Sequence, residues 1–472
     1  MNSSQHTIWW HVYPLGFAGA DTTGADRSPA PRLLDLVPWL DHLLALGANG
    51  LALGPVFKSS THGYDTIDWL AVDPRLGTEA DLVTLIEAAH AKGVQVMLDG
   101  VFNHVGPEFP ALIEARSDPS SPAASLFRRD DDGSLGTFEG HGGLIALDHD
   151  SPEVARQVTE VLTYWADRGV DAWRLDAAYA VPSTFWATVL PVLRERHPDV
   201  YVVGEVLHGD YVAAVADGGL DSVTQYELWQ GVWHGLNDVN LHELEWALQR
   251  HDGFLDHFVP LTFVGNHDVT RIASQIDDDR HHDHALALLF TLGGTPSVYY
   301  GDELGLRALK EERVGGDDAV RPAFPPAPVD APGVGVPGAL PEVLALHQRL
   351  IGVRRRHPWL HTARSRTVSV SNETLVLEVV GDGPDEALVV ALNLGDDELR
   401  VAEPAPGEWL AGRDAGLDGD GPSVGSHGWA VVARRWGAVS YTHLTMPTTV
   451  AGGTARSSTG RQSKVEPQAE IS

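Results

Sequence analysis

Short apolar runs alternate along the chain with longer stretches in which apolar residues recur every three or four positions. The first pattern is typical of buried strands and the second of amphipathic helices. The predicted strands are 7–14, 50–54, 94–101, 170–176, 200–206, 222–227, 258–265 and 297–300. The predicted helices are 33–46, 79–92, 152–168, 183–196, 241–249, 283–292 and 341–356.

Most of the eight predicted strands are followed by a helix. Residues that commonly begin helices precede three of these, at Thr78, Ser151 and Pro182. Regular alternation of strand and helix favours an α/β fold with a parallel sheet. Eight such units predict a (β/α)8 TIM barrel.

Two connections break this rhythm. Residues 103–150 are rich in Pro, Gly, Asp and Ser and are too many for an ordinary barrel loop, so they indicate a short inserted subdomain after the third strand. Residues 302–340 contain the run FPPAPVDAPGVGVPG. This second segment is either an ordered loop over the barrel mouth or a flexible connection.

Beyond residue 363 the pattern changes to alternating strands such as LVLEVV and ALVVALNL between acidic and glycine turns. This predicts a C-terminal antiparallel β-sandwich domain. The predicted domains are 1–102 (first part of the barrel), 103–150 (inserted subdomain), 151–356 (rest of the barrel) and 363–436 (β domain). Residues 437–472 have no apolar periodicity and are predicted to be disordered or a non-native tail.

Composition narrows the classes of partner. The formal net charge is −32, which repels nucleic acid and anionic membranes. There is no cysteine, so a disulfide, a thiolate metal site and a cysteine nucleophile are all excluded. The first residues do not resemble a signal peptide, and no apolar run reaches the ~20 residues of a membrane span. We therefore expect a cytoplasmic protein with no nucleic-acid or membrane partner.

Carboxylates end four of the predicted strands. Asp99 follows VML, Asp176 follows WRL, Glu205 follows VVG, and His267 with Asp268 follows FVGN. A single Asp after a strand is usually a helix cap or turn residue. Four at corresponding positions would converge on one mouth of a barrel, where burying ionised groups without shared chemistry or a cation is costly.

Paired carboxyl groups suit acid–base and nucleophilic work on a glycosidic bond. Arg174 and Asp176 are two residues apart and share one face of a strand. We expect Arg174 to lower the pKa of Asp176 and keep it ionised, while the apolar strand before Glu205 favours its protonated form. The alternative for Arg174 is a buried salt bridge with no part in catalysis.

These motifs resemble those of the α-amylase family, glycoside hydrolase family 13. DGVFNH (99–104), WRLD (173–176), GEV (204–206) and FVGNHD (263–268) resemble its four signatures in order. GYDTIDWLAVDPRLGT (63–78) and GTPSVYYGDELG (294–305) resemble two further family segments. The similarity runs from about residue 8 to residue 306.

The resemblance implies a role for each matching residue. Asp176 would be the nucleophile of a retaining mechanism, Glu205 the general acid/base and Asp268 a ligand of the sugar hydroxyls, with Arg174 orienting Asp176. The implied substrate-binding residues are Tyr64, Asp65, His104, His267 and Arg321. Asp99 and Asn103 would hold the barrel mouth together.

The chain departs from the family pattern after the nucleophile. Typical α-amylases carry Lys-His at the third and fourth following positions, whereas this chain has Tyr179-Ala180. This puts endo-acting starch hydrolysis in doubt and favours short α-glucans such as malto-oligosaccharides. No cofactor is expected to be required. Asn103 and Asp148 match positions that bind structural calcium in the family, but no further ligand is evident, and Ca²⁺ takes six to eight oxygens.

Two other functions remain open at this point. A transglycosylase would use the same catalytic residues with a sugar hydroxyl as acceptor. A non-catalytic carbohydrate-binding or scaffold barrel would lack a nucleophile or an acid, and neither is missing here. Linkage preference, exo or endo action and oligomeric state are not encoded in these motifs.

Overall fold

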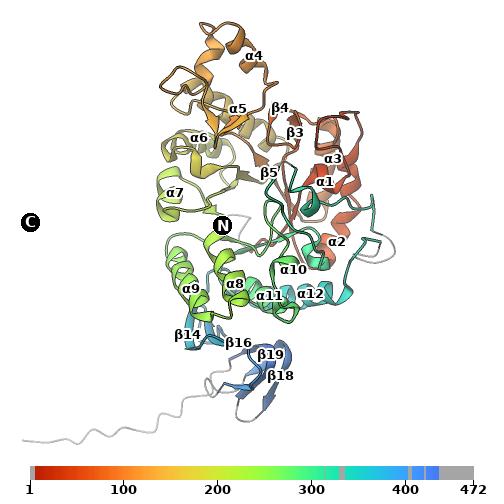
Figure 1. Ribbon diagram of the computed structural model, residues 1–472, viewed down its shortest axis with the longest axis vertical. Coiled ribbons are helices and arrows are strands. Elements are labelled where there is room, and N and C mark those ends of the chain that lie inside the picture. Colours follow the sequence, from red (N-terminus) through yellow and green to blue (C-terminus); the bar gives the residue numbers. More distant parts are fainter. Residues whose placement is uncertain (1–5, 314, 329–334, 402–406, 419–420, 435–472) are drawn as a thin grey trace, which may run out of the picture. The chain divides into compact units, whose positions relative to one another are not determined.

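The computed structural model describes residues 6–313, 315–328, 335–401, 407–418 and 421–434 (Figure 1). The chain divides into two compact units, 1–435 and 436–472, and the described residues belong to the first. The predicted tail, 437–472, therefore lies outside the described residues. The other predicted domain boundaries stay predictions.

An eight-stranded parallel sheet forms the barrel, in the order β11-β10-β9-β5-β2-β1-β13-β12. A parallel bridge between Thr224 and Leu261 joins its two end strands, and Gln225 N–H donates to Leu261 O at 2.9 Å. The strands are β1 (Trp9–Val12), β2 (Gly50–Leu53), β5 (Gln95–Gly100), β9 (Ala172–Leu175), β10 (Tyr201–Gly204), β11 (Ser222–Val223), β12 (Leu261–Thr262) and β13 (Thr295–Tyr299). All eight predicted strands are confirmed, and with them the barrel.

Side chains fill the barrel interior, as in other barrels of this kind. Alternate residues of the strands point inward and form one buried apolar cluster of Trp9, Ala52, Met97, Ala172, Tyr201, Val203, Leu261 and Phe263. A larger apolar cluster includes residues of the same strands and of the surrounding helices. The barrel is therefore a packed support whose open end carries the polar residues.

The main barrel helices are α2 (Trp39–Leu46), α3 (Glu79–Ala91), α5 (Pro152–Ala166), α6 (Ser183–Arg196), α7 (Tyr211–Gly218), α8 (Tyr226–Asn237), α9 (Leu241–Leu255), α11 (His282–Thr291) and α12 (Pro341–Arg356). The short helices α1 (Pro14–Phe17) and α10 (Ile272–Gln275) add to them. Thr78 starts α3 through a reciprocal capping box with Asp81. The seven predicted helices are confirmed, although the first is split into η1 (Arg32–Leu36) and α2.

Two parts of the barrel differ from the sequence prediction. The predicted strand 222–227 ends at Val223, because Tyr226 and Glu227 already form the first turn of α8. Gln225 caps that turn by accepting the Leu228 N–H. Helices α7 and α8 were not predicted, since aromatic, glycine and β-branched residues give them weak helical propensity.

The inserted subdomain follows β5. It contains β6 (His104–Val105), α4 (Pro110–Ser117), η2 (Pro122–Leu126), β7 (Thr137–Phe138) and β8 (His141–Ala146), with β8 between the other two strands of a small antiparallel sheet. A separate hairpin pairs β3 (Phe57–Ser59) with β4 (Thr66–Val72). After β13, the described part of 302–340 holds η5 (Asp302–Leu304) and η6 (Asp318–Val320) and lines the barrel mouth, in agreement with the ordered-loop alternative.

The C-terminal region is antiparallel, as predicted. Its strands are β14 (Arg364–Val370), β15 (Thr374–Val380), β16 (Ala387–Asn393), β17 (Leu399–Arg400), β18 (Glu408–Asp418) and β19 (Gly421–Ala433). They join into one hydrogen-bonded sheet, in which β19 pairs with β16, β17 and β18. Within the described part of the chain, no helix has both the length and the apolar character needed to cross a bilayer.

Candidate active site

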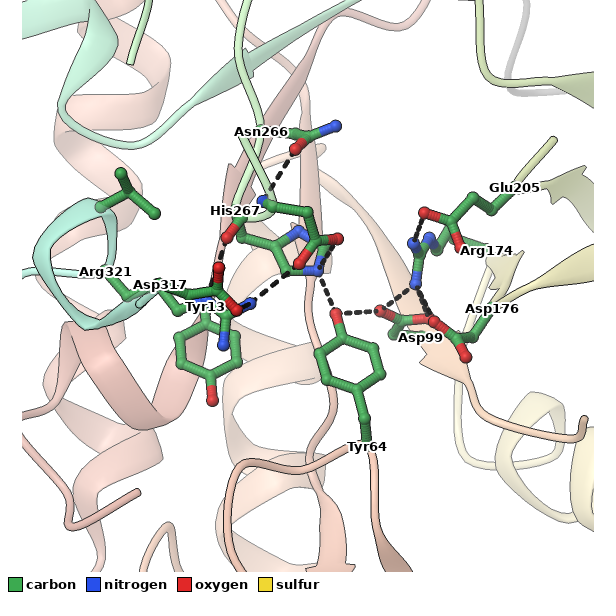
Figure 2. Close-up of polar contacts among 12 residues, drawn as sticks. Tyr13, Tyr64, Asp99, Arg174, Asp176, Glu205, Asn266, His267, Asp317 and Arg321 are labelled. Carbon is green, nitrogen blue, oxygen red and sulfur yellow. Dashed lines mark hydrogen bonds and ion pairs between the residues drawn. The ribbon is translucent and has the colours of Figure 1, made fainter. Parts of the chain in front are cut away.

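Strand register brings the predicted catalytic residues to one rim. Asp99 on β5 and Arg174 on β9 are direct cross-strand partners, as are Leu175 on β9 and Gly204 on β10. Asp176 and Glu205 each follow the last residue of their strand, so they leave the sheet side by side (Figure 2). In a parallel barrel this carboxyl-terminal rim is where catalytic residues gather.

Arg174 contacts three carboxylates at once (Figure 2). Its Nη1 lies 2.8 Å from both carboxylate oxygens of Asp99 and 3.0 Å from Oδ1 of Asp176, and its Nη2 lies 2.6 Å from Oε1 of Glu205. Asp176 and Glu205 are thus held within hydrogen-bond distance of one guanidinium. Their separation of about 5–5.5 Å, expected for a retaining pair, stays a prediction.

One cation among three carboxylates leaves an excess of negative charge. Burial raises the pKa of Asp176 well above its usual range; Arg174 opposes this shift, and Glu205 and Asp99 add to it. The expected effect of Arg174 is present, since Arg174 lowers the pKa of Asp176. Desolvation and the carboxylates of Glu205, Asp99 and Asp268 outweigh it, so the expectation that Arg174 keeps this pKa low is wrong.

Two further donors hold Glu205. The Ala177 N–H donates to Oε2 at 2.9 Å from a residue with φ +45°, and the Tyr226 hydroxyl lies 3.3 Å from Oε1. Asn266 links this group to the fourth motif, because its Nδ2 donates to the Tyr226 oxygen at 2.9 Å and its Oδ1 accepts the Asp268 N–H at 2.8 Å. Both carboxyl oxygens of Glu205 are thereby fixed.

Sequence reasoning missed Tyr226 and Asn266. Asn266 lies inside the FVGNHD motif, which singled out only His267 and Asp268. Tyr226 falls within the predicted strand 222–227, but it is the first residue of α8, three positions after the end of β11. Its place near the end of the predicted strand was still a usable signal for this tyrosine.

Asp268 lies in a different electrostatic environment. His267 Nε2 lies 2.9 Å from its Oδ2 and Arg321 Nη2 lies 2.8 Å from its Oδ1. Burial opposes ionisation, but His267, Arg321 and Arg174 outweigh it and hold the pKa of Asp268 well below its usual range. These neighbours favour the ionised form of Asp268.

Tyr64 joins the two halves of the site. Its hydroxyl lies 3.2 Å from Asp99 Oδ2 and contacts His267 Nε2, and its ring stacks on that of His267 with centroids 5.5 Å apart (Figure 2). Arg321 donates to His267 O at 2.9 Å and to Asp317 Oδ2 at 3.0 Å. Arg321 therefore lies at this rim, held by His267, Asp268 and Asp317, and its contact with substrate stays a prediction.

A cavity of about 860 Å³ opens over this rim. Six of the predicted residues line it: Tyr64, His104, Asp176, Glu205, Asp268 and Arg321. Arg174, Asp99 and His267 lie around a smaller cavity of about 50 Å³. The β7–β8 hairpin and residues Arg313, Gly315, Asp317 and Asp318 contribute walls to the larger one, which is of the size of small-molecule sites.

The remaining predicted residues lie at the edge of the site. His104 Nε2 contacts Tyr64 O at 3.1 Å, and burial lowers the pKa of His104 to about 4, so its ring is neutral at neutral pH. Asp65 is buried, and Thr61 N–H and Oγ1 donate to its carboxylate at 3.0 and 2.6 Å. Asp65 thus shapes the 61–65 turn and does not line the cavity.

The predicted calcium ligands are engaged within the protein. Asn103 Nδ2 contacts His104 Nδ1 at 3.1 Å, and Asp148 Oδ1 accepts the Asp150 N–H at 3.1 Å. Asn103 and Asp148 are close in the fold, since the Leu147 N–H donates to Asn103 O at 3.0 Å. These donors offer few oxygens for Ca²⁺, and calcium binding here stays a prediction.

The chain matches the family model for the α-amylase catalytic domain over residues 11–137 and 138–326. It is 27% identical over 418 residues to a cyclomaltodextrinase from Bacillus sp, which covers 82% of this chain and 72% of that protein. It is 30% identical over 332 residues to a maltogenic α-amylase from Bacillus acidopullulyticus, covering 64% of this chain and 56% of that protein.

A solved structure gives the same result. The ligand-free cyclic α-maltosyl-(1→6)-maltose hydrolase from Arthrobacter globiformis superposes with a TM-score of 0.74 at 25% identity, covering 91% of this chain and 98% of that one. The family match covers most of the chain, including every strand end that carries a predicted catalytic residue. The chain therefore belongs to the α-amylase family of glycoside hydrolases.

Proposed function

We propose that this protein is a retaining glycoside hydrolase that cleaves α-glucosidic bonds in short α-glucans such as malto-oligosaccharides. One observation carries the proposal: Asp176 and Glu205, from adjacent strand ends, share the guanidinium of Arg174 at the floor of a cavity that Asp268 also lines. Two neighbouring carboxyl groups on a cavity are what a double displacement at a sugar carbon requires.

In the proposed first step, ionised Asp176 attacks the anomeric carbon and Glu205 donates its proton to the departing glycosidic oxygen. A glycosyl ester forms on Asp176 as the carbon–oxygen bond to the leaving sugar breaks. In the second step, Glu205 takes a proton from water, whose oxygen displaces Asp176 and releases the sugar with its original anomeric configuration. Asp268, in its ionised form, binds sugar hydroxyls and stabilises positive charge on the ring in both steps.

The proposed substrate class rests on the shape of the cavity and on the relatives. Tyr179 occupies the position at which typical α-amylases have lysine, and its hydroxyl donates to Glu139 Oε1 at 2.7 Å. The leaving-group side of the site is therefore bordered by this Tyr179–Glu139 pair instead of a lysine cation. Asp317 and Asp318 also border the cavity. The names of the relatives, a cyclomaltodextrinase and a maltogenic α-amylase, agree with maltose-type glucans. The expected cytoplasmic location stays a prediction.

The test follows the anomeric proton of the first product by NMR during hydrolysis of maltotriose, with isomaltose, sucrose, trehalose, pullulan and starch as comparisons. We expect the α anomer first and the highest rate with maltotriose. Initial formation of the β anomer would refute the retaining mechanism. Products longer than maltotriose would assign the protein to the transglycosylase alternative, because a sugar then replaces water as acceptor.

A further inference from the structure

A second cluster of imidazole and carboxylate side chains lies where the barrel meets the C-terminal sheet. His281 is the last residue of η4 (Asp279–His281), Asp278 is the residue directly before η4, and His427 lies on β19. One potential ligand atom from each lies within 4.8 Å of the others. None of the three lines the active-site cavity, and the proposed mechanism uses none of them.

The two imidazoles face each other. His281 Nε2 and His427 Nδ1 are 2.9 Å apart. Two Zn–N bonds of about 2.0–2.1 Å at a tetrahedral angle place their nitrogens about 3.3 Å apart. To share a metal ion, the two nitrogens would have to separate by a few tenths of an ångström. The two rings would also have to turn until both lone pairs point at an ion beside the line between the nitrogens.

The surroundings of His427 match those of a metal-bound histidine. Its Nε2 lies 3.2 Å from Asp396 Oδ1, and metal ligands commonly donate their second ring N–H to a carboxylate. That bond leaves Nδ1 with its lone pair directed at His281. His427 also has φ +52°, a left-handed conformation in which histidine is more frequent than most residues other than glycine.

Arg280 occupies the Asp278 carboxylate. Its N–H and Nε lie 3.0 Å from Oδ1, and its Nε and Nη2 lie 3.1 and 2.6 Å from Oδ2. A carboxylate offers about four acceptor positions, so a metal would bind Asp278 by displacing part of this ion pair. Two imidazoles with one carboxylate suit Zn²⁺, whereas Ca²⁺ and Mg²⁺ prefer oxygen ligands alone.

We propose that Asp278, His281 and His427 bind one Zn²⁺ ion, with water in the fourth position, and that this ion fastens the barrel to the C-terminal sheet. The ligands come from η4 and β19, which contact each other in the fold. An ion held in this way stabilises the folded chain, because the ligands are brought together only when the barrel and the C-terminal sheet are both folded.

The test uses the full chain, dialysed against EDTA and then titrated with zinc chloride by calorimetry, with thermal unfolding measured in parallel. We expect one Zn²⁺ per chain and a rise in Tm of roughly 3 °C at a hundred times Kd. His281→Gln and His427→Asn should each weaken binding by at least about tenfold, since each loses a first-row-metal ligand. Asparagine is chosen at 427 because it tolerates a left-handed backbone.

A control variant separates this site from a rival. His234, Asp238 and Glu243 form a second group of similar spacing at the end of α8, so His234→Gln should leave the bound zinc unchanged. Zinc binding that survives both His281→Gln and His427→Asn, or that only His234→Gln removes, would overturn the proposal, as would no binding at all. Asp278→Asn leaves both imidazoles in place and carries the same test if a histidine variant does not fold.

Discussion

Asp176 and Asp268 carry the same carboxyl group in opposite electrostatic settings. Burial and two neighbouring anions raise the pKa of Asp176, whereas His267 and Arg321 hold the pKa of Asp268 low in spite of burial. Buried carboxyl groups with strongly shifted pKa values are characteristic of functional sites. The raised pKa means that ionising the Asp176 carboxyl in the folded protein costs free energy.

We therefore predict that removing the Asp176 carboxylate lowers activity and raises stability. Since the folded-state pKa is raised, the protonated form stabilises the fold at low pH, and that contribution is lost as the pH rises through the folded-state pKa. Asp176→Asn should therefore lower kcat by about 10³-fold or more while raising Tm at neutral pH. Steady-state kinetics and thermal unfolding measured from pH 4 to pH 8 check both parts.

The control for that experiment is Asp217→Asn, which removes a carboxylate from an exposed position on α7. It should change neither kcat nor the pH dependence of Tm. Near-full activity in Asp176→Asn would contradict the catalytic role of Asp176. Lower stability than the parent at every pH would contradict the raised pKa of Asp176.

Tyr226 is expected to position Glu205. Its hydroxyl lies 3.3 Å from Glu205 Oε1 and is itself fixed by Asn266. Tyr226→Phe should lower kcat about 10- to 100-fold, the value of one hydrogen bond to a charged group, with little change in KM. Tyr211→Phe removes a similar buried hydroxyl that donates to Leu207 O, and should leave both constants unchanged. Equal effects in the two variants would count against a positioning role.

At the scale of elements, the sequence predicted those helices and strands that have a clear periodic pattern of apolar residues. Helices α6 and α12 begin and end where predicted, and a proline marks the start of each, Pro182 before α6 and Pro341 at the first residue of α12. Helix α8 was missed because its first residues continue an apolar strand pattern, and only tertiary packing decides between the two. The site residues on strand ends were found for the same reason, whereas Tyr226 was lost with its helix.

The β7–β8 hairpin is expected to limit substrate length. Glu139 has φ +48° and accepts the hydrogen bond of Tyr179 across the cavity wall. Glu139→Gly relieves the backbone conformation and removes this pair, so the leaving-group side opens. We expect kcat/KM for starch relative to maltotriose to rise several-fold, measured by reducing-sugar release. An unchanged ratio would mean that another part of the cavity sets substrate length.

At the scale of the whole molecule, strand–helix alternation predicted the barrel, a long Pro- and Gly-rich connection predicted the insertion, and alternating apolar residues predicted the C-terminal sheet. Contacts between distant segments were not predictable in the same way. Neither the Asp268–Arg321 pair nor the His281–His427 contact follows from local pattern, since the partners are far apart in sequence and only the folded chain brings them together. The balance of charges around Asp176 depends on the same long-range packing.

The separation of the proposed zinc site from the catalytic cavity predicts a selective effect of metal removal. EDTA should lower Tm and leave kcat for maltotriose hardly changed, because none of the three proposed ligands lines the cavity. Unfolding and kinetics measured on the same EDTA-treated sample check this. Strong loss of activity that calcium restores would instead favour a calcium role for Asn103 and Asp148.

Covalent trapping tests the proposed roles of Asp176 and Glu205 most directly. The Glu205→Gln variant, incubated with an α-glucosyl fluoride whose leaving group needs no acid, should accumulate the glycosyl-enzyme because no base activates water. Peptide mapping by mass spectrometry should place one hexose on Asp176. A hexose on another residue, or rapid turnover of the fluoride with no adduct, would contradict the assignment of Asp176 as nucleophile and Glu205 as acid/base.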